Sequence, residues 1–178
     1  DRLYLNEDGN YLAVRQFVDT EYSVVVYNLS GVTPVVEYTV TADMIHSPPG
    51  TVYSSAGESW RTGNVIRLSA DGKYLVMGCC TNYTYGSANR ELSAFVFKNT
   101  SVGWAKVGAV FSDDKTSYGS LGMDTQDNWL DIDANCSRIA IGMPEQPSQC
   151  VKIWDVNDYT TDTPTFSAPV VITDASTL

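Results

Sequence analysis

The sequence predicts an all-β protein made of three β-propeller blades, each with four antiparallel strands. One turn motif occurs three times, with Asp8, Asp71 and Asn135 at matched positions 63 and 64 residues apart. A fixed period of this length indicates a repeat architecture. Each repeat contains four short runs rich in valine, isoleucine and tyrosine, which suit a pleated, half-buried surface. No stretch has the apolar spacing of a helix, and four short antiparallel strands form one propeller blade.

The four runs follow the same order in every repeat. The first run precedes the turn, at residues 2–5, 65–68 and 129–132. The second run follows the turn, at residues 11–14, 74–77 and 138–141. The third run covers residues 24–27, 94–97 and 151–154, and the fourth covers residues 35–38, 105–110 and 168–172. The repeats predict blades at residues 1–64, 65–127 and 128–178, the last of them incomplete.

The turn between the first two runs reads Asp8-Gly9, Asp71-Gly72 and Asn135-Cys136. Asp-Gly between apolar runs predicts a tight hairpin in which both central residues take a positive φ. Residues 41–61 and 112–128 are rich in Ser, Gly, Pro and Asp, so we expect loops that join successive blades.

Length and charge narrow the class of protein. Three blades are fewer than the roughly 4–8 that close a ring, and the 178-residue chain does not begin with Met. We therefore expect a segment of a larger propeller or array. No apolar run reaches the roughly 18 residues that span a bilayer, which predicts no membrane-spanning segment. The net charge of −10 repels phosphate backbones and disfavours binding to nucleic acid.

Four Asn-x-Ser/Thr sequons predict glycosylation. Their asparagines lie in predicted turns or loops, where a glycan is accommodated: Asn28, Asn82, Asn99 and Asn135. Glycosylation of this kind takes place in the secretory pathway, so we expect an extracellular or cell-surface protein.

The four cysteines favour the same oxidising compartment. Cys79 and Cys80 are expected just after the second strand of the middle blade, and Cys150 just before the third strand of the last blade. These positions share one end of the strands, which makes a bridge from Cys150 to one of the pair geometrically possible. A vicinal Cys79–Cys80 bridge and unpaired thiols are the alternatives. Cys136 lies in a turn at the opposite end, too far from Cys150 for a disulfide.

Candidate metal and ligand sites are few. The alternating oxygens of Asp131, Asp133 and Asn135 resemble the spacing of a calcium loop. Cys136 replaces the glycine of such a loop and no acidic residue closes it, so we expect no required metal or cofactor. Aromatic side chains in the long loops are candidates for ligand recognition: Tyr83, Tyr85 and Tyr118.

Catalysis has little support in the sequence. His46 is the single histidine and lies in a turn-rich segment, and the chain has no G-x-S-x-G motif. No glycine-rich phosphate loop is present either. We therefore expect a protein that is not an enzyme.

The repeats resemble a known family. Leu68-Ser-Ala-Asp-Gly-Lys-Tyr-Leu-Val-Met-Gly78, followed by Phe95-Val-Phe97 and Gly103-Trp104, is similar to the FG-GAP-like repeat of integrin-α-type propellers. Gly142-Met-Pro144 is similar to the Val-Gly-Ala-Pro ending of that repeat. The resemblance covers nearly the whole chain and implies adhesion, matrix or cell-surface assembly.

The sequence therefore predicts a non-enzymatic, extracellular propeller segment with a structural or protein-interaction role. A lectin-like propeller that binds glycans is the first alternative, and it needs aromatic residues clustered on one loop face. A propeller glycosidase is the second, and it needs carboxylates that converge on the central axis. Expected partners are further blades, other protein chains or a glycan. Six side chains are expected to be buried between blades: Tyr4, Val14, Val26, Phe97, Ile141 and Trp154.

Overall fold

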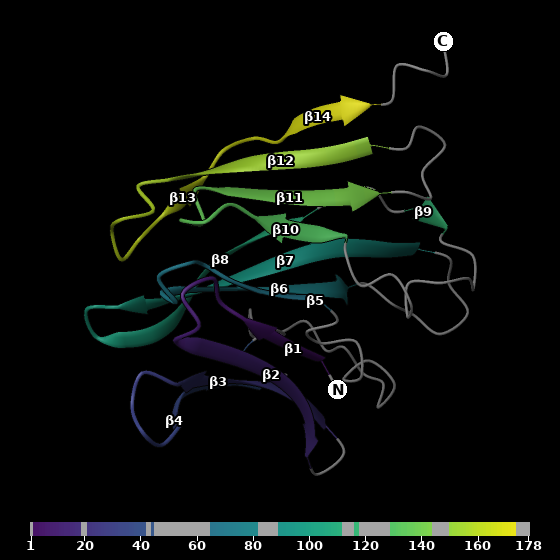
Figure 1. Cartoon of the computed structure of the whole chain (residues 1–178). Coiled ribbons are helices and arrows are strands. Elements are labelled where there is room, and N and C mark those ends of the chain that lie inside the picture. Colours follow the sequence, from purple (N-terminus) through teal and green to yellow (C-terminus); the bar gives the residue numbers. More distant parts are fainter. Residues whose placement is uncertain are drawn as a thin grey trace.

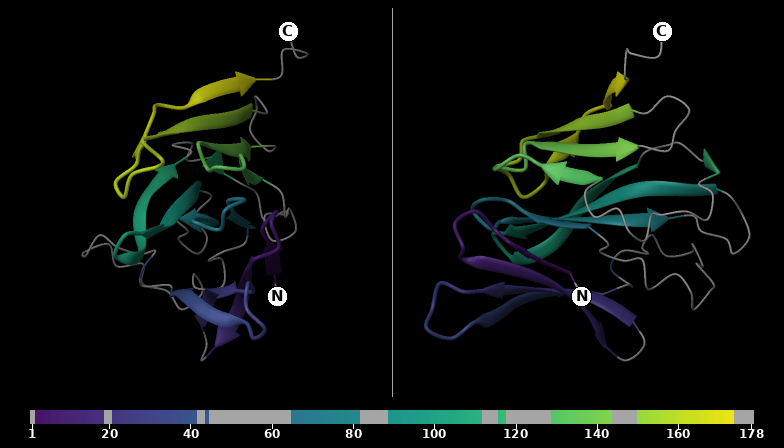
Figure 2. Two further views of the ribbon diagram at one scale, coloured as in Figure 1. Left: turned by 60° about the vertical axis from the view of Figure 1, so that its left-hand side comes forward. Right: turned by 45° about the vertical axis from the view of Figure 1, so that its right-hand side comes forward.

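The computed structural model consists of three antiparallel sheets that lie side by side in chain order (Figure 1). The structure describes residues 2–18, 21–41, 44, 65–81, 89–111, 116–117, 129–143 and 150–173. The regular elements that these residues form are β-strands. The middle sheet lies between the other two in both views of Figure 2.

Each sheet is built from consecutive strands. Sheet 1 has the order β1 (Arg2–Leu5), β2 (Tyr11–Val18), β3 (Glu21–Asn28) and β4 (Val35–Val40). Sheet 2 has the order β5 (Val65–Leu68), β6 (Tyr74–Thr81), β7 (Asn89–Thr100) and β8 (Gly103–Phe111), and the short β9 (Thr116–Ser117) pairs with β7. Sheet 3 contains β10 (Leu130–Ile132), β11 (Arg138–Met143), β12 (Cys150–Asn157), β13 (Thr165–Phe166) and β14 (Val170–Thr173).

The register is the same in all three sheets. The second residue pair of the second and third strands, counted from the turn, matches in position: Leu12 with Tyr27, Leu75 with Phe97, and Ile139 with Trp154. These pairs confirm that the aromatic residues Tyr27, Phe97 and Trp154 occupy equivalent positions, as the repeat predicts.

The fourth strand is irregular at one equivalent place in every sheet. The pairing of β3 with β4 shifts between Val26 and Tyr27, and the pairing of β7 with β8 shifts between Val96 and Phe97. In sheet 3 the irregularity becomes a break, so β13 and β14 pair separately with β12. The strand expected over residues 168–172 is present as β14 but begins two residues later than predicted, at Val170. Pro169 lies in the break, where its missing N–H prevents ladder pairing.

The turn between the first two strands is held by the side chain of its first residue. An oxygen of that side chain accepts a hydrogen bond from the backbone N–H five residues later, at 2.8–2.9 Å: Asn6 from Tyr11, Ser69 from Tyr74, and Asp133 from Arg138. Asparagine, serine and aspartate all present such an oxygen, so the sequence repeats the function although the residue type changes.

Only the fourth residue of each turn has a positive φ. The values are 72° at Gly9, 69° at Gly72 and 56° at Cys136. The expectation that the preceding aspartate shares this conformation is wrong. The turn is longer than a two-residue hairpin, and the backbone N–H of the fourth residue bonds to the carbonyl of the first.

Two hydrophobic cores fill the spaces between successive sheets. The core between sheets 1 and 2 includes Val24, Val26, Leu75 and Phe97. The core between sheets 2 and 3 includes Val76, Val96, Ile139 and Trp154. Sheet 2 is buried on both faces because it lies between the other two sheets. Successive side chains of its strands point to opposite sides, so each strand supplies residues to both cores.

Four of the six side chains expected in these cores are buried: Val26, Phe97, Ile141 and Trp154. Tyr4 and Val14 are half-buried. Val14 projects from the face of sheet 1 that points away from sheet 2, where the described residues include no further sheet.

Candidate protein-interaction site

The face of sheet 1 that points away from sheet 2 carries exposed apolar side chains. Leu3 is 71% exposed and Leu5 is 50% exposed. Their cross-strand partners Val14 and Leu12 are half-buried, and Val25 in the middle of the face is buried. We call the set Leu3, Leu5, Leu12 and Val14 the sheet 1 outer face.

The equivalent positions of the next sheet are packed. Ile66 and Leu68 in β5 correspond to Leu3 and Leu5, and both are buried in the core between sheets 1 and 2. The two leucines of β1 therefore stand at positions that are covered wherever a preceding sheet is present.

The opposite end of the molecule has a second exposed apolar face. On sheet 3 the side chains that point away from sheet 2 are Val151, Ile153, Val170 and Ile172, which we call the sheet 3 outer face. Val170 is 61% exposed and Ile172 is 53% exposed. These side chains leave apolar surface in contact with water. Burying that surface would stabilise a contact by roughly 25 cal/mol per Å².

The equivalents of the sheet 3 outer face are again packed. In sheet 2 they are Ala94, Val96, Gly108 and Val110, which lie against sheet 3. Gly108 shows how close this contact is, because a Cβ added there would lie 2.2 Å from a ring carbon of Phe166. Both outer faces thus carry the side-chain pattern of a sheet-to-sheet contact.

A polar row crosses the three innermost strands. Tyr4, Arg67 and Asp131 occupy equivalent positions in β1, β5 and β10. The guanidinium carbon of Arg67 lies 5.2 Å from the Tyr4 ring centroid, and Arg67 Nε donates to Asp131 Oδ1 at 2.9 Å. The Asp131 side chain is 73% exposed, whereas that of Arg67 is 15% exposed. The row joins neighbouring sheets along their inner edge.

The turns of neighbouring sheets are also joined in series. Asn6 Nδ2 donates to the carbonyl of Ala70 at 2.6 Å, and the N–H of Ala70 donates to the carbonyl of Ala134 at 2.7 Å. Ala70 and Ala134 are second residues of their turns, and the second residue of the first turn is Glu7. The acceptor carbonyls repeat with the period of the sequence, whereas the donor is the Asn6 side chain in the first link and the Ala70 backbone N–H in the second.

A lysine links sheet 3 to sheet 2 by hydrogen bonds, at the end of the strands where the turns lie. Lys98 is buried, and its ammonium donates to the carbonyls of Tyr159 and Thr161, at 2.7 Å for Tyr159. The same nitrogen lies 5.0 Å from the centroid of the Tyr74 ring, whose hydroxyl also donates to the Tyr159 carbonyl. Burial lowers the pKa of Lys98, and the nearby Asp162 carboxylate opposes that shift.

Asp162 completes this contact by binding Ser101. The Ser101 backbone N–H lies 3.2 Å from each carboxylate oxygen, and the Ser101 hydroxyl donates to Oδ2. These hydrogen bonds, led by that from the hydroxyl, lower the pKa of Asp162. A depressed carboxyl pKa stabilises the fold above the unfolded pKa of about 4, and this contribution is lost as the pH falls through the folded pKa.

Ser101→Ala is therefore expected to reduce the acid sensitivity of the fold. The variant should lose less unfolding free energy than the natural protein between about pH 5 and pH 2, as measured by urea unfolding at each pH. Ser30→Ala, which removes an exposed hydroxyl that donates to Asn28, is the matched control. Equal acid losses in the Ser101 variant and the natural protein would contradict the assignment.

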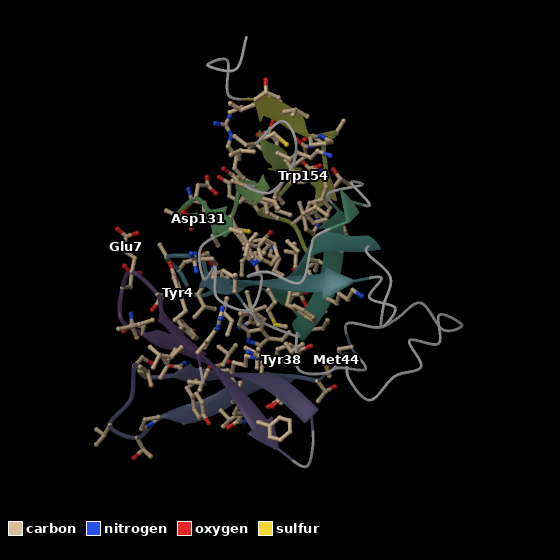
Figure 3. The ribbon with its side chains drawn as sticks, turned by 90° about the vertical axis from the view of Figure 1, so that its right-hand side faces the viewer. Tyr4, Glu7, Tyr38, Met44, Asp131 and Trp154 are labelled. Atoms are coloured by element: carbon tan, nitrogen blue, oxygen red, sulfur yellow. The ribbon has the colours of Figure 1, made fainter. Side chains whose placement is uncertain are left out.

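Aromatic rings pack at the outer edge of the core between sheets 1 and 2. Tyr38 and Trp104 stack with ring centroids 5.5 Å apart, and the Tyr38 hydroxyl donates to the sulfur of Met44 at 3.5 Å (Figure 3). Burial raises the pKa of Tyr38. These rings are used for packing between sheets 1 and 2.

The three residues of the calcium candidate point to different partners. Asp131 pairs with Arg67, whereas Asp133 accepts hydrogen bonds from Arg138 N and Ser137 Oγ within its own turn. Asn135 is exposed in the same turn. Within the described part of the chain, no group of three or more His, Cys, Asp or Glu side chains is placed to hold a metal.

Three of the four sequon asparagines lie in the described structure. Asn28 ends β3, where its Oδ1 accepts from the N–H and hydroxyl of Ser30 and its Nδ2 donates to Glu37 at 2.8 Å. Asn99 is half-buried near the end of β7, and Asn135 is exposed. Glycosylation at each of them stays a prediction.

Three of the four cysteines belong to strands, whereas the sequence predicts them just outside strands. Cys79 and Cys80 are within β6 and not after it, and Cys150 is the first residue of β12. Cys150 is half-buried against the core between sheets 2 and 3. A bridge from Cys150 to Cys79 or Cys80 stays a prediction.

Cys136 is a buried thiol in the third turn. Burial raises its pKa, with a smaller contribution from Asp133 in the same direction. Because the thiolate is the reactive form, Cys136 is expected to resist iodoacetamide at about pH 8 in the folded protein and to react fully in guanidinium chloride. Peptide mass analysis measures both. Rapid alkylation without denaturant would contradict this placement.

The remaining candidates lie outside the described residues. These are Asn82, Tyr83, Tyr85, Tyr118 and His46. In the part of the chain that the structure describes, no helix is long and apolar enough to cross a membrane.

Comparison with known proteins gives little similarity. No family matches the chain, and no curated protein matches its sequence significantly. Among solved structures, a crystal structure of TolB from Acinetobacter baumannii is similar over 96% of this chain, with 13% identity and a TM-score of 0.30. The chain covers 44% of the length of that TolB chain.

Sequence reasoning missed the row of Tyr4, Arg67 and Asp131 and the lysine contact. The row had a visible signal, because each first run places one polar or aromatic residue between two apolar ones at the repeat spacing. The lysine contact had none, because its acceptors are backbone carbonyls of residues 159 and 161.

Proposed function

We propose that this chain is a non-enzymatic, extracellular propeller segment that works by packing its two outer faces against protein. The proposal rests on one observation. The side chains of the two outer faces match those that pack between sheets 1 and 2 and between sheets 2 and 3. Leu3 and Leu5 repeat Ile66 and Leu68, and Ile172 repeats Val110. An exposed apolar face of this kind marks a protein contact in a soluble protein.

The polar groups of the described structure support binding over catalysis. Asp131 and Arg67 bond to each other, and Asp133 holds its turn. A glycosidase needs two carboxylates that flank one bond, at roughly 5–10 Å from each other with free oxygens. These polar groups are used to join sheets and to hold a turn.

Photo-crosslinking in the cells that make the protein tests the packing role. A photoreactive phenylalanine replaces Leu3 or Ile172 in the natural polypeptide, and Val32 or Val102 as fully exposed turn controls. The outer-face positions are expected to crosslink to strand residues of a neighbouring sheet, mapped by mass spectrometry. Absence of protein crosslinks at both outer-face positions, or equal crosslinking at the controls, would sink the proposal.

The extracellular location has a separate test. Intact-mass analysis of the native protein before and after glycosidase treatment is expected to show the loss of at least one N-glycan. An unchanged mass together with four alkylatable thiols in the denatured protein would contradict secretion.

A further inference from the structure

We propose that Asn28 and Asn99 carry N-glycans whose first sugars cover the exposed valines of the adjoining hairpin loops, Val32 and Val102. The inference rests on the proposed function, because N-glycans are added in the secretory pathway, and it names the modified residues and the surface that the glycans cover. In the transfer, a bond from the asparagine side-chain nitrogen to C1 of the first sugar replaces one N–H bond. The bond from C1 to a lipid diphosphate donor breaks, and the diphosphate and the proton leave.

The three described sequon asparagines lie at one end of the strands. Asn28 pairs with Tyr11, the first residue after the first turn. The backbone N–H of Asn99 donates to the carbonyl of Lys73, which ends the second turn, at 2.8 Å. Asn135 lies within the third turn. The loops that join β3 to β4 and β7 to β8 project at this same end (Figure 1), so glycans on these residues gather there.

Two of these sequons are each followed by a fully exposed valine. Val32 lies in the loop that follows Asn28, and Val102 lies in the turn that follows Asn99. Removing apolar surface from water is favourable, and the pyranose ring of a sugar has an apolar face of C–H groups. A sugar on either asparagine is within reach of the valine in the adjoining loop.

The carboxamides of both asparagines are placed for modification. Within the described part of the chain, the Asn99 side chain makes no hydrogen bond. Nδ2 of Asn28 donates to Glu37 at 2.8 Å, and Oδ1 of Asn28 accepts from the N–H and hydroxyl of Ser30. An asparagine nitrogen has two donor hydrogens. One can therefore be replaced by a sugar while the other keeps the bond to Glu37.

Glycans at these sites leave both outer faces free for packing. Asn28 shares its side of β3 with Val24 and Val26, which pack toward sheet 2. Asn99 belongs to sheet 2 itself. Neither residue lies on the sheet 1 outer face or the sheet 3 outer face, so the glycans and the protein contacts occupy different surfaces.

Glycopeptide mapping of the protein secreted by the cells that make it tests the two sites. Peptide N-glycosidase in heavy-oxygen water converts each glycosylated asparagine to an aspartate that carries the heavy isotope. We expect the isotope at Asn28 and at Asn99. An unlabelled asparagine at either site overturns the proposal, and label confined to Asn82 or Asn135 does so while the extracellular location stands.

Hydrophobic-interaction chromatography tests whether the glycans cover the valines. The double variant Val32→Ser/Val102→Ser is expected to keep the retention time of the glycosylated natural protein and to elute earlier than it once the glycans of both are removed enzymatically. Val171→Ser, which changes an exposed valine of β14, is the matched control and should shorten retention equally before and after removal. If the double variant behaves as this control does, the sugars do not cover the valines.

Failure of this inference is separate from failure of the proposed function. Crosslinks from Leu3 and Ile172 report packing on the outer faces whether or not Asn28 and Asn99 carry glycans. Absence of those crosslinks overturns the proposed packing role, and the mapping still decides the two glycan sites.

Discussion

Replacing Lys98 with methionine is expected to lower the free energy of unfolding by about 3 kcal/mol. Methionine keeps most of the apolar stem but removes the ammonium that binds the carbonyls of Tyr159 and Thr161. Hydrogen bonds from a charged donor contribute about 1.5–3 kcal/mol each, and the contact of the cation with the Tyr74 ring adds about 0.5–2 kcal/mol. Desolvation of the ammonium offsets part of this sum. Urea unfolding at neutral pH measures the change.

Lys73→Met is the matched control for the loss of a positive charge. Lys73 is exposed, and its ammonium lies 3.6 Å from the carboxylate of Asp71 in an exposed ion pair. Such pairs contribute about 0–1 kcal/mol, so the control should lose less than about 1 kcal/mol. If Lys98→Met unfolds at the same urea concentration as the control, the lysine contact does not fasten sheet 3 to sheet 2.

The strand order of the fold could be predicted from the sequence because the signal is local. Apolar runs at a period of 63–64 residues identified the same strands in each repeat, and the register confirms that Phe97 and Trp154 are equivalent. The broken fourth strand of sheet 3 also had a local signal in Pro169, which cannot donate a hydrogen bond to a neighbouring strand.

The contacts between sheets could be predicted only in part. Arg67 and Asp131 have opposite charges 64 residues apart, so stacking of equivalent strands would bring them together. The lysine contact depends on how residues 158–162 turn back toward sheet 2, where Asp158 has a φ of 54°. The acceptors there are backbone atoms that every residue carries. Residue type therefore does not reveal this contact.

The outer faces, too, could be predicted from the sequence only in part. Alternation in β1 places Leu3 and Leu5 on one face, and this is readable from the sequence. Whether that face is covered depends on neighbours, and the exposure of both leucines became known only from the structure. Val14 was expected to be buried as though a neighbour were present, and it is half-buried because it belongs to the same face.

Gly72→Ala is expected to lower the free energy of unfolding by about 3 kcal/mol. Gly72 has a φ of 69°, and an L-residue in this conformation costs about 1–2 kcal/mol. A Cβ at this position would also lie 2.0 Å from a ring carbon of Tyr11 in sheet 1, so the ring must move. Forcing added volume into a packed contact costs about 1–3 kcal/mol. Urea unfolding of the variant measures the sum.

Gly9→Ala separates the two causes. Gly9 has a φ of 72° in the equivalent turn, and a Cβ there would have no atom within 4 Å, so only the conformational cost of about 1–2 kcal/mol is expected. The remaining loss in Gly72→Ala reports the contact between the second turn and Tyr11. Tyr11→Ala in the Gly72→Ala background should abolish that remainder in a double-mutant cycle. Equal losses in the two glycine variants would show that Tyr11 does not pack on the second turn.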